Sequence, residues 1–196
     1  MGGLDAGCGP IIADRSGPIP LEQIDSAIDA ALKAGIVDFD TAPLYGDSED
    51  RLGHALANSS LGDQAQVYTK AGKLIRRICG NKQIALLGPQ PWSGFAVPLE
   101  ERCLLPDYSA AGARLSCQES CERLGIEKLH TLRIHDPDSI EGVWDQAVAA
   151  DGLIAGLRQV RYQGDLRRLC TTCYPLFEPP WSETVEMCRR PPPAQG

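Results

Sequence analysis

The chain is 196 residues long, 43% hydrophobic and 23% charged, with a formal net charge of −7. This length supports one globular core, and this balance excludes a wholly disordered chain and a coiled coil. No run approaches the roughly 18 apolar residues of a membrane-spanning helix, and an acidic chain lacks the basic surface that non-specific nucleic-acid binding needs. Residues 1–5 lack the basic start and apolar stretch of a secretory signal, so we expect a cytoplasmic protein.

Helical and strand patterns alternate in the first part of the chain. Apolar residues at helical spacing predict a helix over 21–32, bounded by a proline and a glycine. A short strand is expected at 36–40 and another at 66–70, because both are rich in residues that favour strands. Between them a second helix is expected to begin at Ser48, whose hydroxyl would cap it.

The pattern is interrupted over residues 71–106, which lose periodicity and contain four prolines. Such a stretch predicts a long loop. Regular patterns return with a helix at 115–124, a strand at 129–135, and two helical pieces, one at 143–148 and one that carries Leu153, Leu157 and Val160. The alternation of helix and strand with short connections favours βαβ units and a parallel sheet.

The last part of the chain has a different composition. We expect one domain over 1–168 and an extended, mostly disordered tail over 169–196, because prolines and cysteines are concentrated there. Cys170 and Cys173, with Cys188 as a third ligand, are a weak candidate for a zinc site, since a structural zinc ion needs four ligands. Eight cysteines without a secretory signal instead predict reduced thiols, and we expect no bound metal.

The most informative segment is FDTAPLYG, residues 39–46. It places the carboxylate of Asp40 at the end of a predicted strand and the phenol of Tyr45 in the loop beyond. Lys70 ends the next predicted strand, and His135 ends the one after it. The carboxyl ends of parallel strands in an α/β barrel form its active-site face, so we expect these four side chains to converge.

The four side chains have complementary chemistry. A phenol with a reference pKa of about 10 is a poor acid at neutral pH unless its anion is stabilised. A lysine ammonium favours the phenolate, and an aspartate paired with that lysine keeps it charged and aimed. An imidazole can donate a hydrogen bond to a carbonyl oxygen. Such a set can protonate a carbonyl oxygen while a hydride reaches its carbon.

Each of these residues also has a structural interpretation when it is taken alone. Asp40 suits a cap or turn, Tyr45 a rim, Lys70 an exposed strand end and His135 the start of a turn. The chemical interpretation is favoured because all four stand at predicted strand ends in one reading frame. The two other histidines are assigned to structure, since one is in a helix and one is out of phase with the predicted site; they are His54 and His130.

The order and spacing of several segments resemble the aldo-keto reductase family. The matching segments are AALKAG (30–35), FDTAPLYG (39–46), SEDRLG (48–53), YTK (68–70), DYS (107–109), SCQESCERLG (116–125) and IHDPD (134–138). The resemblance extends from about residue 21 to residue 168. It is strongest to the branch that oxidises pyridoxal and aldoses such as L-fucose, D-arabinose or L-galactose.

This resemblance implies the N-terminal portion of a (β/α)8 TIM barrel, with about four to five βα units. It implies an oxidoreductase that transfers hydride between NADP(H) or NAD(H) and a carbonyl or sugar substrate. The acidic charge and the lack of a long apolar run, by themselves, predict no nucleic-acid or membrane partner. In the family the residue matched by Tyr45 donates or accepts the proton, and the one matched by Lys70 tunes it. Asp40 would pair with Lys70 and contact the cofactor, and His135 would orient the substrate carbonyl.

Three features depart from the family pattern. Asp38 shares a strand face with Asp40 at a position that is usually apolar or aromatic, and two inward carboxylates without a second base disfavour barrel closure. Residues 1–12 resemble the first strand of the family only faintly. A whole (β/α)8 barrel takes about 250 residues, and most of the family's cofactor site belongs to the part that the pattern does not reach.

Two functions are therefore compatible with the sequence. The first is an aldo-keto reductase-type oxidoreductase whose catalytic tetrad is present and whose cofactor site is incomplete. The alternative is a catalytically inactive truncated fragment or pseudoenzyme that acts through protein association, including self-association through an open sheet edge. Binding of NADPH separates the two.

Overall fold

The computed structural model describes residues 5–7, 13–14, 17–77, 102–137, 142–163 and 166–172. The strands are β1 (Asp5–Gly7), β2 (Ala13–Asp14), β3 (Gly17–Pro18), β4 (Asp38–Asp40), β5 (Gln66–Ala71), β6 (Lys73–Arg77), β7 (Arg102–Pro106), β8 (Leu129–His135) and β9 (Leu166–Thr172). The α-helices are α1 (Leu21–Lys33), α2 (Ser48–Asn58), α3 (Ala110–Leu124), α4 (Val143–Val148) and α5 (Leu153–Gln163), with short 3-10 helices η2 (Pro43–Tyr45) and η3 (Gly62–Gln64).

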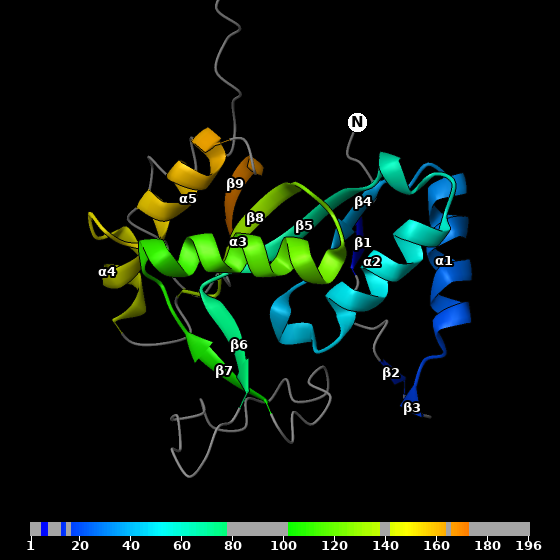
Figure 1. Ribbon diagram of the computed structural model, residues 1–196, viewed down its shortest axis with the longest axis horizontal. Helices are drawn as coiled ribbons and strands as arrows, with labels where there is room; N and C mark the ends of the chain where they lie inside the picture. Colours follow the sequence, from blue (N-terminus) through cyan, green and yellow to red (C-terminus); the bar gives the residue numbers. More distant parts are fainter. Residues whose placement is uncertain are drawn as a thin grey trace, which may run out of the picture.

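A five-stranded parallel sheet organises the described part of the chain. Its strands lie in the order β1-β4-β5-β8-β9, which is also their order in the sequence (Figure 1). Within this sheet, at least one α-helix lies along the chain between each strand and the next strand of the sheet. Parallel neighbours joined by helical crossovers in strictly sequential order are the arrangement of a (β/α)8 barrel. The predicted βαβ units and parallel sheet are therefore confirmed.

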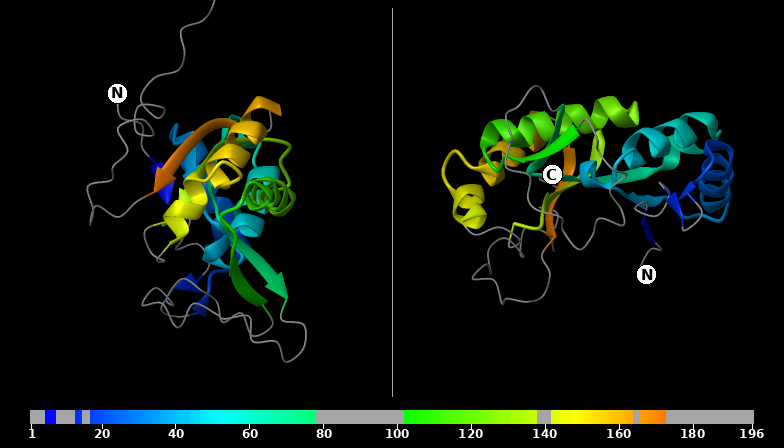
Figure 2. Two further views of the ribbon diagram at one scale, coloured as in Figure 1. Left: turned by 90° about the vertical axis from the view of Figure 1, so that its left-hand side faces the viewer. Right: turned by 90° about the horizontal axis from the view of Figure 1, so that it is seen from below.

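The helices form a layer on one side of this sheet. Figure 2 shows α2, α3 and α5 on the same side of the strands, and in sequence order α1 packs on α2, α2 on α3 and α3 on α5. The core lies between helices and strands. Its fully buried apolar side chains include Phe39, Leu132 and Ile134 from the strands, and Leu52, Leu124, Leu153 and Leu157 from the helices.

The opposite face of the sheet is polar. Phe39, Val67 and Leu132 belong to the core, so the alternate residues on the same strands point away from the helices. In the register Asp40 is paired with Tyr68, and Lys70 is paired with Arg133. The strand pattern therefore lines up ionisable side chains from β4, β5 and β8 on the face that the helices leave open.

One of the two central helices begins earlier than expected, and the other begins where expected but without the expected cap. Helix α3 starts at Ala110, five residues before the predicted start, because the Ser109 hydroxyl accepts a hydrogen bond from the Gly112 amide at 3.1 Å and caps it. Helix α2 does begin at Ser48, but the predicted cap is wrong. The Ser48 hydroxyl is buried and lies 2.9 Å from the hydroxyl of Thr41, which ties the helix to the end of β4.

The predicted loop at 71–106 is wrong at both of its ends. Strands β6 and β7 pair there as an antiparallel ribbon, with Lys73 opposite Pro106. Each strand has five residues and its partner is distant in sequence, so neither gives a clear local pattern. Residues 78–101 lie outside the described part of the chain.

Both ends of the sheet differ in detail from the expectations. Strand β1 is short, yet it pairs with β4 in parallel, so a first strand is present where the sequence resembles one only faintly. Strand β9 pairs with β8 from Leu166 to Thr172, so the expected boundary after residue 168 falls inside a strand. Residues 173–196 of the expected tail lie outside the described residues. No helix in the described ranges is long and apolar enough to cross a membrane.

Candidate functional site

The four residues expected to converge do lie together, at the carboxyl ends of β4, β5 and β8. The Lys70 ammonium is 2.8 Å from an Asp40 carboxylate oxygen and 4.8 Å from the centre of the Tyr45 ring. The Tyr45 and His135 rings are 6.4 Å apart between centroids and nearly perpendicular, at 84°. Three neighbouring strands therefore bring a carboxylate, an ammonium, a phenol and an imidazole into one cluster.

Lys70 is the centre of this cluster and is almost completely buried. Its ammonium donates to the Asp40 carboxylate and to the backbone carbonyl of Thr41, both at 2.8 Å. Burial of a charge is costly unless it is paired and hydrogen-bonded. Because both acceptors are consecutive residues at the end of β4, the turn of the chain after that strand fixes the position of the ammonium.

His135 is held in its neutral form. Its side chain is buried, and burial lowers its pKa well below the usual 6.5, with the positive charges of Lys73 and Lys70 acting in the same direction. Its Nε2 atom lies 3.4 Å from an Asp136 carboxylate oxygen. Its Nδ1 atom is buried and has no hydrogen-bond partner among the described residues. A neutral imidazole can hydrogen-bond a ligand without carrying charge.

Tyr108 holds the backbone of His135 by a hydrogen bond. It is fully buried, and its hydroxyl donates to the backbone carbonyl of His135 at 2.6 Å. Its ring lies against Gly72, where a Cβ atom would come within 2.6 Å of the ring. Gly72 also has a positive φ of 101°, so the chain between β5 and β6 requires glycine both for its backbone and for the space.

A fully buried carboxylate lies behind Lys70, on the helix side of the sheet. Glu49 of α2 is fully buried and accepts hydrogen bonds from the Thr69 hydroxyl at 2.5 Å and from Arg123 Nε at 2.6 Å. This contact joins α2, β5 and α3 at the residue next to Lys70. In the sequence, Glu49 appears only as a favourable acidic residue in the first turn of a helix, so its buried role was not predicted.

The expected conflict between Asp38 and Asp40 does not arise, because the second base is present. Arg133 of β8 donates to the free carboxylate oxygen of Asp40 at 2.7 Å, and Asp38 accepts a hydrogen bond from the Tyr68 hydroxyl at 3.0 Å. The Arg133 guanidinium also lies 5.0 Å from the centre of the Tyr68 ring. Sequence reasoning missed Arg133, although it stands at i−2 from His135 and so on the same strand face.

The remaining predicted residues lie apart from this cluster or outside the described residues. His54 is exposed on α2 and pairs with Asp25 at 3.1 Å, while His130 is half-buried beside Tyr68. Among the residues that the structure describes, no group of three or more His, Cys, Asp or Glu side chains could hold a metal ion. Two cysteines of the weak zinc candidate, Cys173 and Cys188, are not described.

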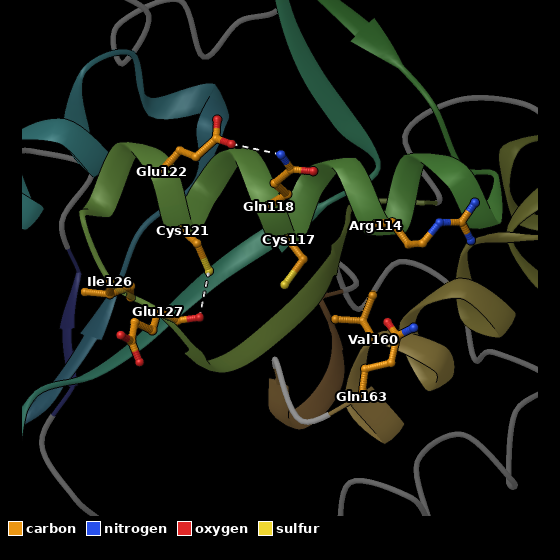
Figure 3. Close-up of a pocket in the computed structure, with 9 residues that line it drawn as sticks. All are labelled: Arg114, Cys117, Gln118, Cys121, Glu122, Ile126, Glu127, Val160 and Gln163. Carbon is orange, nitrogen blue, oxygen red and sulfur yellow. Dashed lines mark hydrogen bonds between the residues drawn. The ribbon is translucent and has the colours of Figure 1, made fainter.

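A groove of about 430 Å³ lies in the helix layer, between α3 and α5 (Figure 3). Cys117 and Cys121, one turn apart on α3, both face it, and the Cys121 thiol lies 3.9 Å from the Glu127 carbonyl oxygen. Its other lining residues include Arg114, Gln118 and Val160. The groove belongs to the helix side of the sheet, whereas Lys70 and Arg133 lie on the opposite face, so it is separate from the site around Tyr45.

Comparisons with known proteins agree with this fold and this motif order. The family model described as "Aldo/keto reductase family" matches residues 9–175. A D-threo-aldose 1-dehydrogenase from a Pseudomonas species is 35% identical over 146 residues, which are 74% of this chain and 42% of that protein. A pyridoxal 4-dehydrogenase from Microbacterium luteolum is 29% identical over 160 residues, 76% of this chain and 46% of that protein.

A solved structure shows the same fold. A putative aldo-keto reductase from Pseudomonas aeruginosa superimposes with a TM-score of 0.60 at 20% identity, covering 86% of this chain and 54% of that one. This chain thus spans less than half the length of the two curated relatives. The described sheet and helices correspond to part of an α/β barrel. With the family model matching most of its length, the chain belongs to the aldo/keto reductase family.

Proposed function

We propose that the cluster around Lys70 is the proton-transfer site of an oxidoreductase that interconverts an aldose or another small carbonyl compound and its oxidised or reduced form. The observation that carries the proposal is the Lys70 ammonium, fixed by Asp40 at 2.8 Å and directed at the Tyr45 ring at 4.8 Å. An ammonium in this position favours the phenolate, so the phenol can give up and regain a proton. The names of the relatives support an aldose as substrate.

The assignment of the proton to Tyr45 rests on the state of His135. A histidine whose pKa is held well below its usual value is neutral at physiological pH and has no extra proton to give. Its ring lies beside the Tyr45 ring, with 6.4 Å between centroids, where a neutral imidazole is suited to orient the substrate oxygen by a hydrogen bond. Tyr45 then acts as general acid toward the carbonyl oxygen in reduction, and as general base toward the hydroxyl in oxidation.

The residues present fit the carbonyl end of a nicotinamide-dependent reaction. When bound, NADP(H) or NAD(H) would supply or accept the hydride. Asp40 is the residue that we assign to contact with the cofactor: each of its oxygens already accepts one hydrogen bond, and each retains a lone pair for a hydroxyl group. We assign no described residue to the phosphates of the dinucleotide.

The decisive variant is Tyr45→Phe, which removes the hydroxyl and keeps the ring. With L-galactose or pyridoxal as probe substrate and NAD⁺ or NADP⁺ as oxidant, we expect kcat to fall at least about a hundredfold. Cofactor affinity, measured by NADPH fluorescence, should be unchanged, because the lost hydroxyl is assigned to the substrate oxygen. Undiminished turnover by Tyr45→Phe would remove this residue from the mechanism.

The second candidate is a non-catalytic chain that acts through association with another protein. It is favoured by the chain's match to only 42% of the D-threo-aldose 1-dehydrogenase and by a sheet whose described part ends on the edge strands β1 and β9. The two candidates differ in cofactor binding. Absence of NADPH binding at millimolar concentration would favour the non-catalytic candidate over the oxidoreductase.

A further inference from the structure

We propose that Arg133 is a positioning residue for the Lys70–Tyr45 pair, acting through the shared carboxylate of Asp40. The inference rests on the proposed function and extends it to a residue that the resemblance did not assign. Asp40 binds Lys70 through one oxygen at 2.8 Å and Arg133 through the other at 2.7 Å. One carboxylate therefore serves two cations, and the group of three side chains carries a net charge of +1.

Strand register explains why the carboxylate must be shared. Lys70 and Arg133 are direct partners across β5 and β8, where like charges repel each other. Asp40 comes from β4, on the far side of β5, and reaches both cations. Charge-assisted hydrogen bonds at both of its oxygens fix the rotation of the carboxylate, so the Lys70 ammonium is held over the Tyr45 ring instead of turning away.

Arg133 is itself anchored by Tyr68, which lies two residues before Lys70 on β5. Its guanidinium lies over the Tyr68 ring at 5.0 Å, and the Tyr68 hydroxyl donates to Asp38 at 3.0 Å. A chain of contacts thus runs from Asp38 through Tyr68 and Arg133 to Asp40 and on to Lys70. Guanidinium groups favour such planar stacking combined with carboxylate binding, so the position of Asp40 is set by contacts from three strands.

The electrostatic consequence concerns the phenol. If Asp40 paired with Lys70 alone, the two charges would largely cancel at the distance of Tyr45. Because Arg133 takes part of the carboxylate's charge, more of the positive field of Lys70 remains at the phenol and favours the phenolate. Arg133 acts on the phenol through Asp40, which it binds at 2.7 Å, so we treat it as a positioning residue and not as a catalytic residue.

Other charged groups belong to β6 and α2, which contact η2, and to the end of β8, whose His135 ring lies beside the Tyr45 ring. They come from β6, from the end of β8 and from the start of α2, and they are Lys73, His135, Asp136, Asp47, Glu49 and Asp50. All of them remain in every variant below. A difference between variants therefore reports the charge at position 133.

The test is an ultraviolet titration of tyrosinate absorbance in the intact chain, which needs no turnover. Subtracting the titration of Tyr45→Phe from that of the parent isolates the Tyr45 phenol, and the same subtraction is made in each variant background. Arg133→Met should move this ionisation to higher pH by up to about one unit, a tenfold change in the ionisation constant. Arg133→Lys keeps a cation and should restore most of the shift.

Arg161→Met is the matched control, because Arg161 is an exposed arginine on α5 and its loss removes the same charge far from the site. An ionisation that moves no more in Arg133→Met than in Arg161→Met overturns the inference, and so does a failure of Arg133→Lys to restore it. Loss of turnover in Tyr45→Phe together with an unmoved titration would keep the proposed function and reject the role of Arg133. The reverse pair of results would keep the electrostatic role and reject the proposed function.

Discussion

His135 is a described residue whose pKa departs strongly from that of a free imidazole. Its imidazole is enclosed by the end of β8, by Lys73 and by Lys70, and its pKa is lowered well below 6.5 mainly by burial. The folded protein therefore keeps it neutral, whereas the unfolded chain protonates it near its usual pKa. At acidic pH, protonation of His135 therefore favours the unfolded chain over the folded one.

We expect the lowered pKa of His135 to cause a loss of stability at low pH. As the pH falls below 6.5, the unfolded chain binds a proton that the folded chain does not, so the free energy of unfolding decreases by up to about 1.4 kcal/mol per pH unit until the folded-state pKa is reached. Urea unfolding of the parent and of His135→Asn at several pH values measures the difference in slope. His54→Asn, which removes an exposed imidazole, is the control; equal slopes in the parent and His135→Asn would contradict the prediction.

At the level of elements, the site depends on contacts between α2, β5 and α3 that lie on the helix side of the sheet. Glu49 accepts from Thr69 and Arg123, and Ser48 bonds Thr41, whose carbonyl accepts from Lys70. Thr69 is adjacent in the chain to Lys70, and Thr41 is adjacent to Asp40. Helix packing and site geometry are therefore coupled through the ends of β4 and β5.

Removal of the buried carboxylate of Glu49 should destabilise the protein strongly. Glu49→Ala leaves the Arg123 guanidinium and the Thr69 hydroxyl without their acceptor, which we expect to cost about 3 kcal/mol of the free energy of unfolding. Glu122→Ala removes an exposed carboxylate from the same helix as Arg123 and should cost less than about 0.5 kcal/mol. Chemical denaturation compares the free energies of unfolding of the two variants. Similar losses would show that the buried contacts of Glu49 stabilise the fold no more than an exposed carboxylate does.

The connection between β5 and β6 offers a second test. Gly72→Ala forces a methyl group to within 2.6 Å of the Tyr108 ring and also strains a φ of 101°, so we expect a loss of about 2–4 kcal/mol. Gly125→Ala, at the end of α3, has a φ of 65° and open space, and should cost only about 1–2 kcal/mol. The comparison of their unfolding midpoints separates steric contact from backbone strain, and an equal loss in both would argue against the contact with Tyr108.

At the scale of the molecule, the described sheet ends on β1 and β9. Strand β9 pairs with β8 over Leu166–Thr172, and the order of the sheet places no described strand on its other side. Edge strands favour pairing with a further strand, which can come from another chain. The polar face of the sheet, with Asp40, Lys70 and Arg133, is the side that the helices do not cover.

We expect this architecture to give concentration-dependent self-association. The sedimentation coefficient of the purified chain should rise with concentration, because two edges can pair where a closed barrel would have none. A single species of monomer mass over a wide concentration range would contradict this expectation. The same preparation serves for the NADPH titration, so association and cofactor binding are compared on one sample.

Much of the fold follows from local patterns in the sequence. The strand at 129–135 and the helix at 143–148 have the bounds expected for them, and α1 extends only one residue beyond the expected 21–32. Periodicity is clear in α1 because this helix buries one face, through Ile24, Ile28 and Leu32. The ribbon of β6 and β7 was missed since each strand finds its partner far along the chain, and the start of α3 was missed since its first residues, Ala110 to Gly112, carry no apolar pattern.

By itself, the sequence determined which chemical groups stand at the strand ends: Asp40, Tyr45, Lys70 and His135 are placed there by strand periodicity and motif order. Only the tertiary structure decided how they are held. Arg133 contacts Asp40 across 93 positions of sequence, and Glu49 contacts Arg123 across 74; such pairs depend on sheet register and helix packing. Burial, which makes His135 neutral, is likewise a property of the assembled layers, because a side chain loses its water only when distant segments close around it.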